Sequence, residues 1–214
     1  MKSPTIFILF LLSAFYTSLL PSATAQVVLD KNGFPLRDGG KYYVLPVMAG
    51  FGGGVRVAAT GKESCPLTVV LSSSPYDRGI GTIISSPYRD APLITEGYSL
   101  SFKFVDFPVV PSCAPLRSEW TVVDGQPEGT AVKIGAPQNA ENGWFRIATA
   151  SPKGYKLVFC PSFLMDSTCE DVGIHVDGKK NARLVLTEDD PLLVEFEKYD
   201  PFWPQNNLVL PTSE

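Results

Sequence analysis

Short runs of alternating apolar and polar residues recur along the chain from about residue 40 onward. Leu100–Phe104 alternates strictly, as a strand does when one face lies against a core and the other meets solvent, and Tyr155–Phe159 and Leu193–Glu197 alternate with one exception each. No segment after residue 25 keeps a capped helical period near 3.6 residues. The pattern predicts β-strands at Tyr42–Pro46, Leu67–Leu71, Gly81–Ser85, Tyr98–Phe104, Trp120–Val123, Val132–Ile134, Trp144–Ile147, Tyr155–Phe159, Leu184–Leu186 and Leu192–Phe196.

Residues that favour turns separate these predicted strands, for example at Asp124–Gly125, Asn142–Gly143 and Asp177–Gly178. Many short strands at roughly 8–12-residue spacing indicate an all-β sandwich or barrel. An aromatic-apolar strand also recurs about every 56 residues, a unit that cannot bury an apolar face alone. We therefore expect three such units around a common core in one domain.

The first 25 residues have the features of a secretory signal peptide. A basic start is followed by the apolar run Ile6–Leu20 and by Pro21–Ala25, which ends in an A-x-A pattern of small residues. The apolar run is shorter than the ~20 residues that span a bilayer. We expect a signal peptide over residues 1–25, a folded domain over 26–200 and a Pro-broken C-terminal tail over 201–214.

Composition narrows the classes of function. The chain has 214 residues, 44% of them hydrophobic, which is enough to bury a sizeable core. Its net charge of −4 gives no electrostatic support for binding nucleic acid. No segment after the signal peptide is long and apolar enough to cross a membrane, so we expect neither nucleic acid nor membrane as a partner.

The four cysteines predict two disulfides. An even number in a secreted chain points to disulfide bonds, and the sequence alone allows three pairings, of which the sequential one is the simplest. A zinc site would need cysteine pairs separated by only two to four residues, and the chain has none. We expect no metal and no cofactor. The four are Cys65, Cys113, Cys160 and Cys169.

No set of residues suggests an enzyme. His175, the one histidine, lies on the polar phase of the alternating segment Val172–Asp177 and is expected to face solvent. Glu195 and Glu197 share one strand face, which invites comparison with a glycosidase carboxylate pair, but we expect both to be solvated. Gly50–Val55 lacks the Lys-Ser/Thr of a phosphate loop and is expected to need positive φ.

Several segments together resemble one family. Val28–Val44 is similar to the N-terminal signature of the plant Kunitz-type, soybean trypsin inhibitor family. The residues that match the signature are Val28, Asp30, Gly33, Leu36, Tyr42 and Val44. Further similar stretches are Glu63–Val70, Gly79–Arg89, Ala131–Gly135, Asn142–Arg146 and Tyr155–Pro161, so the resemblance covers nearly all of the chain after residue 25.

The resemblance implies a β-trefoil, a six-stranded barrel capped by three hairpins. It implies the disulfides Cys65–Cys113 and Cys160–Cys169. It also implies a monomeric inhibitor of trypsin-type serine proteases rather than an enzyme, with a role in plant defence or in seeds. The protein would be secreted or vacuolar, and the tail would be either a trimmed propeptide or a frayed terminus.

The resemblance also assigns a reactive loop. Arg89 aligns with the residue that fills the protease specificity pocket, called P1, and Asp90 follows it as P1′. Pro87 and Tyr88 precede them, and Pro87 stiffens the loop by fixing φ. Asp38 aligns with a family Asn that braces this loop.

Three features depart from the family pattern. Asp90 stands where an apolar residue is common, the loop from Arg89 is one residue longer, and Asp38 lacks an amide that could donate to two loop carbonyls. They leave two alternatives to a trypsin inhibitor. One is a storage or binding protein on the same scaffold with weak or lost inhibition, and the other is an inhibitor of a cysteine protease or α-amylase.

Overall fold

The computed structural model describes residues 25–48, 50–65, 67–88, 91–105, 117–126, 129–135, 140–151, 154–161 and 168–202. Within these ranges the chain forms strands, bridges and turns but no helix, so none is present there to span a membrane. The strands are β1 (Gly40–Pro46), β2 (Val55–Ala58), β3 (Thr68–Leu71), β4 (Thr82–Ser85), β5 (Ser101–Phe104), β6 (Trp120–Gln126), β7 (Gly129–Ile134), β8 (Ala140–Glu141), β9 (Trp144–Ser151), β10 (Gly154–Cys160), β11 (Glu170–Val176), β12 (Ala182–Thr187) and β13 (Leu193–Lys198).

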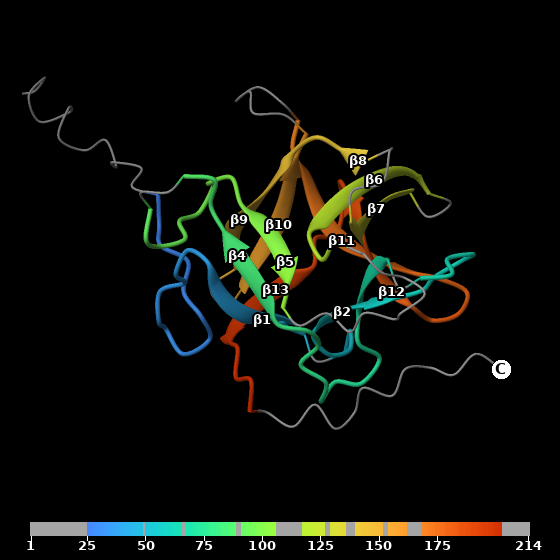
Figure 1. Ribbon diagram of the computed structural model, residues 1–214, viewed down its shortest axis with the longest axis horizontal. Helices are drawn as coiled ribbons and strands as arrows, with labels where there is room; N and C mark the ends of the chain where they lie inside the picture. Colours follow the sequence, from blue (N-terminus) through green and yellow to red (C-terminus); the bar gives the residue numbers. More distant parts are fainter. Residues whose placement is uncertain are drawn as a thin grey trace, which may run out of the picture.

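Six of these strands close into a barrel (Figure 1). Antiparallel pairing runs from β5 to β4, β1, β13, β10 and β9. The remaining seam, between β5 and β9, is closed by Leu100 and Phe145: the N–H of each donates to the C=O of the other, at 2.8 and 3.1 Å. The closed circuit leaves the barrel no unpaired edge.

Three hairpins, β2–β3, β6–β7 and β11–β12, cap one end of the barrel. They also pair with one another, through β3–β7, β3–β12 and β7–β12, and gather on the right of Figure 1. The chain thus forms three successive units, each with two barrel strands and one hairpin: β1–β4, then β5, β6, β7 and β9, then β10–β13. This arrangement is a β-trefoil, as the resemblance implied.

The barrel interior follows from the alternation seen in the sequence. On β5, Phe102 and Phe104 are buried while Lys103 between them is exposed. Trp120 of β6 stacks on Phe102 with ring centroids 5.1 Å apart, and the Phe145 ring meets Phe102 edge-on at 5.6 Å. Such offset and edge-to-face pairs add about 0.5–1.5 kcal/mol each to the area they bury. An aromatic cluster therefore fills the second unit.

Glu197 on β13 differs from its prediction. It was expected to be solvated, but it is only 8% exposed. Lys31, from the N-terminal segment, pairs with its Oε2, and Arg78 Nη1 lies 2.7 Å from its Oε1. Because two cations reach over this end of β13 from other parts of the chain, the carboxylate is covered and neutralised. His175, by contrast, is exposed on β11 as predicted.

The glycines before β2 are needed for close packing. Gly52 has φ +113°, in agreement with the predicted need for positive φ. A Cβ at Gly54 would lie 1.9 Å from the carbonyl oxygen of Arg78, which leaves room only for hydrogen. The two segments can therefore touch backbone to backbone. The glycine-rich sequence predicted a loop here, so β2, which begins at Val55, was not expected.

A disulfide joins Cys160, the last residue of β10, to Cys169, which precedes β11. It is the pairing that the resemblance implied, and it ties together two neighbouring strands. Cys65 is also disulfide-bonded. Its predicted partner, Cys113, lies outside the described residues, so the Cys65–Cys113 pairing stays a prediction.

Candidate functional site

The connection from β4 to β5 carries the predicted reactive loop. Its two buried anchors are Ile84 and Ile94, each fully inaccessible to solvent. Between them the chain rises to the surface, where Pro87 is exposed and Tyr88 is 55% exposed. Arg89 and Asp90 lie outside the described residues. The site is therefore described by the two segments that flank them, which end at Tyr88 and begin again at Ala91.

Asp38 contacts both flanks of this connection. Its carboxylate Oδ1 accepts a hydrogen bond from the backbone N–H of Ser86 at 2.6 Å. Its own backbone N–H donates to the carbonyl of Pro92 at 3.1 Å. The next residue, Gly39, donates its N–H to the carbonyl of Ile84 at 2.9 Å. One turn of the chain thus holds the segments that precede Arg89 and follow Asp90.

An acidic residue at position 38 can still support the β4–β5 connection. Unlike Asn, Asp has no amide with which to donate to loop carbonyls. In the structure its side chain faces an N–H donor, Ser86, and the carbonyl of Pro92 is met by the backbone instead. A hydrogen bond from N–H to an ionised carboxylate is stronger than a neutral one.

The N-terminal segment extends this support along the second flank. It runs antiparallel to the chain after the loop, with bridges Val27–Thr95 and Arg37–Leu93. Between them, the Ile94 N–H donates to the Leu36 carbonyl at 2.9 Å. In Figure 1 this pair of segments, blue beside green, lies on the side of the barrel away from the hairpins.

The first flank has a local turn of its own. The Ser86 hydroxyl accepts a hydrogen bond from the Tyr88 N–H at 3.1 Å, a side-chain turn that fixes the backbone just before Arg89. Ser86 was not singled out from the sequence. A Ser two residues before an exposed aromatic in a Pro-containing segment is the signal that could have identified it.

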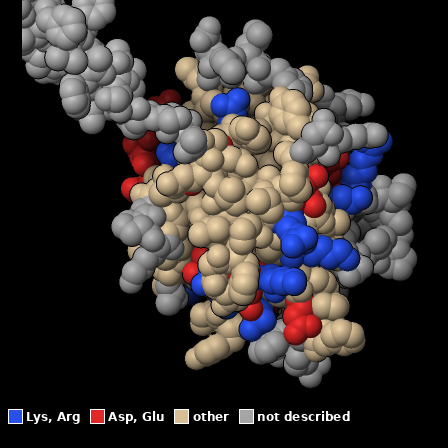
Figure 2. Space-filling model, turned by 90° about the vertical axis from the view of Figure 1, so that its left-hand side faces the viewer, with Lys and Arg blue, Asp and Glu red and all other residues tan. Residues whose placement is uncertain are grey.

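The face of the molecule on the side of this connection is largely uncharged. Figure 2 views the molecule from that side, with uncharged residues over much of the face and several Lys and Arg together on its right and lower parts. Among the described residues no group of three or more His, Cys, Asp or Glu could hold a metal. The described flanks are exposed at Pro87 and Tyr88 and held by Asp38, an arrangement suited to contact with a protein partner.

Comparisons with known proteins agree with this arrangement. A family model described as "Trypsin and protease inhibitor" matches residues 28–198. Trypsin inhibitor A of Glycine max is 52% identical over 204 residues, covering 94% of this chain and 93% of the relative.

Solved structures give the same result in three dimensions. The soybean trypsin inhibitor, in an orthorhombic crystal of its complex with porcine pancreatic trypsin, matches with a TM-score of 0.76 and 50% identity, over 82% of this chain and 100% of that one. A Kunitz type trypsin inhibitor from Cicer arietinum matches with a TM-score of 0.73 and 32% identity, over 82% and 99%.

The fold and these matches together define a protein inhibitor of proteases, not an enzyme. The chain belongs to the legume Kunitz family of trypsin and protease inhibitors.

Proposed function

We propose that this protein inhibits trypsin-type serine proteases by presenting Arg89 as P1 and Asp90 as P1′ of a substrate-like loop. The observation that carries the proposal is the double contact of Asp38 with Ser86 and Pro92, one residue on each flank of the loop. The trypsin inhibitors among its relatives support the choice of target.

The proposed mechanism depends on rigidity. In trypsin-like enzymes an Asp at the base of the specificity pocket selects Arg or Lys, so Arg89 supplies the matching charge. A flexible peptide would lose conformational freedom on binding, whereas a loop already fixed at both flanks avoids most of that cost. Pro87 and Tyr88, exposed beside Arg89, would contact the protease on the side that precedes the scissile bond.

The proposed localisation and processing rest on sequence alone. Cleavage after Ala25 would release a secreted or vacuolar chain beginning at Gln26, and the tail from residue 201 would be trimmed or retained. Intact-mass analysis of the native protein tests both ends. A mass that includes residues 1–25 would rule out the signal peptide, and one that ends at Glu214 would rule out trimming.

The inhibition test is a titration of trypsin with residues 26–214, both disulfides formed, beside Arg89→Ala. The matched control is Arg117→Ala, which removes another exposed arginine, in the segment before β6. We expect stoichiometric inhibition by the parent protein and by Arg117→Ala, at a molar ratio of one to one. Arg89→Ala should weaken inhibition at least 100-fold.

Two outcomes would overturn the proposal in different ways. Equal inhibition by the parent protein and Arg89→Ala would show that another segment binds trypsin. No inhibition by the folded parent protein would favour the storage or binding alternative, or another target, to be assayed next with a papain-type protease and α-amylase.

A further inference from the structure

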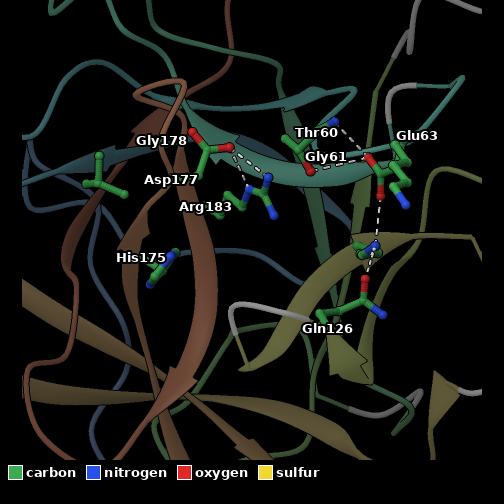
Figure 3. A pocket seen from close by; sticks show the side chains of 11 residues that line it. Thr60, Gly61, Glu63, Gln126, His175, Asp177, Gly178 and Arg183 are labelled. Atoms are coloured by element: carbon green, nitrogen blue, oxygen red, sulfur yellow. Dashed lines mark hydrogen bonds and ion pairs between the residues drawn. The ribbon is translucent and has the colours of Figure 1, made fainter.

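A second candidate site lies at the capped end of the barrel, where the three hairpins meet. An open cavity of about 740 Å³ is lined there by residues from every hairpin (Figure 3). The turn after β2 contributes Thr60–Glu63, β6 and β7 contribute Gln126 and Lys133, and the β11–β12 hairpin contributes His175–Gly178 and Arg183. A volume of this size is typical of sites for small molecules.

The two carboxylates of the cavity are already satisfied by the protein. Glu63 accepts from the Thr60 N–H, from the Thr68 hydroxyl and from Lys133 Nζ at 2.7 Å. Asp177 accepts from the backbone N–H groups of Lys179 and Asn181 and from Arg183. Because their lone pairs are occupied, neither carboxylate is available to bind a cation.

Positive charge remains in excess around the same cavity. Lys62, Lys133 and Arg183 line it against Glu63 and Asp177, a lining charge of 3 − 2 = +1 before His175 is counted. Lys62 and His175 are exposed and make no hydrogen bond or ion pair within the described part of the chain. This local excess stands out in a protein whose net charge is −4.

The cationic side chains are also held in place. Lys133 lies between Glu63 and Gln126, with Nζ 2.7 Å from an oxygen of each. Arg183 donates to Asp177 Oδ2 through both Nε and Nη2, at 3.0 and 2.7 Å. Figure 3 shows Asp177 and Arg183 on one side, and Glu63 and Gln126, the two partners of Lys133, on the other. Fixed donors bind an anion at a lower ordering cost than mobile ones.

We propose that this cavity binds a small organic anion, a phosphate or carboxylate carried on a hydroxyl-rich body of about sugar size. Lys62, which no described carboxylate pairs with, meets the negative group, and Lys133 and Arg183 add their positive charge from either side. The body lies over Gly61 and Gly178, which are exposed and carry no side chain, so that hydroxyls reach the main chain. The hairpins that line the cavity lie on the side of the barrel away from the β4–β5 connection, so both sites can be occupied together.

The test measures binding by isothermal titration calorimetry with three probes: glucose 6-phosphate, glucuronate and uncharged glucose. We expect both anions to bind at least tenfold more tightly than glucose. The stronger of the two identifies the group the site prefers. Equal binding of glucose, or no binding of any probe, would overturn the proposal.

A blocking variant locates the site. A Cβ at Gly178 would meet nothing within 4 Å, so the backbone tolerates a side chain there, and Gly178→Trp should obstruct the cavity that Gly178 lines. Gly50→Trp is the matched control, because Gly50 is equally open and does not line the cavity. Gly178→Trp should weaken anion binding at least tenfold and Gly50→Trp should leave it unchanged. Equal affinity for the anion in the parent protein, Gly178→Trp and Gly50→Trp would show that the anion binds outside this cavity.

Charge reversal tests the recognition chemistry. Lys62→Glu should weaken anion binding severalfold, while Lys198→Glu, the same change at an exposed position on β13, should not. Equal losses in both variants would show that only net charge matters. Saturating probe should leave trypsin titration unchanged, and competition between the two would contradict their placement at opposite ends.

Discussion

Asp38 Oδ1 lies 2.6 Å from the backbone nitrogen of Ser86, 48 positions later in the sequence, and the bond between them is charge-assisted. It joins the turn before β1 to the first residue after β4. The same Asp38 reaches the other flank only through its backbone, at Pro92. Side-chain variants at this position therefore release one flank of the loop and leave the other attached.

Asp38→Ala should weaken trypsin inhibition about tenfold. A hydrogen bond to a charged group is worth roughly 1.5–3 kcal/mol, and each 1.4 kcal/mol is a factor of ten in an equilibrium constant. Asp38→Asn keeps an oxygen that can accept from Ser86 and should lose less. Inhibition constants of the parent protein, Asp38→Ala and Asp38→Asn check this. A larger loss of inhibition in Asp38→Asn than in Asp38→Ala would contradict the role of the Asp38 oxygen as hydrogen-bond acceptor.

Replacing Asp90 by Ala should strengthen inhibition about tenfold. As the proposed P1′ residue, Asp90 would lie against the protease, where an ionised carboxylate loses its hydration. Glu188→Ala removes one negative charge from an exposed position away from the loop and is the control. An inhibition constant that is unchanged in Asp90→Ala would show that the protease accommodates the carboxylate.

Stability should fall as the pH is lowered through the pKa of Asp177. Burial acts to raise this pKa, but hydrogen bonds from Asn181, Arg183 and Lys179 outweigh it and lower the pKa to about 2. Because the folded-state pKa lies below the unfolded value near 3.8, the stabilisation is complete above about pH 5 and is lost as the pH falls toward 2.

Asp177→Asn isolates that contribution. The shift corresponds to about 2 kcal/mol at neutral pH. Urea unfolding should therefore show the variant about 2 kcal/mol less stable at pH 7 and nearly equal to the parent protein at pH 2. A difference that stays constant from pH 7 to pH 2 would mean that packing, and not the ionised carboxylate, is the cause.

Gly54→Ala should destabilise the fold by about 3 kcal/mol or more, because its Cβ would lie 1.9 Å from the Arg78 carbonyl oxygen and the backbone must move. Gly178→Ala is the control, since its Cβ meets nothing within 4 Å and its effect should be small. Thermal unfolding of both variants checks this, and equal melting temperatures would contradict the close approach.

Much of the fold could be predicted from the sequence because its strands follow a simple period. Strict alternation on Leu100–Phe104 corresponds to the buried and exposed faces of β5. The pattern failed at Val55–Ala58, where β2 follows three glycines that looked like loop. It also failed at Glu197, which lies on the exposed phase by alternation but is covered by Lys31 and Arg78 from distant segments.

Less of the candidate site than of the fold could be predicted from the sequence. Resemblance placed Asp38 beside the loop, but whether its side chain meets an N–H or a carbonyl depends on the path of the turn around Gly39. The cavity at the capped end of the barrel could not be predicted from the sequence, because Glu63, Lys133 and Arg183 belong to three hairpins that only the trefoil fold brings together. Charges so far apart in sequence give no local pattern.

The pairing of β1 with β13 has a consequence for biosynthesis. Tyr42 lies opposite Lys198, so the first strand of the barrel meets its partner only after the last strand has been made. Until then β1 can pair with β4 alone, and its other edge stays open to association with neighbouring chains. Barrel closure therefore waits until β13 is available, and such long-range pairing slows folding and lengthens the exposure of that edge to aggregation.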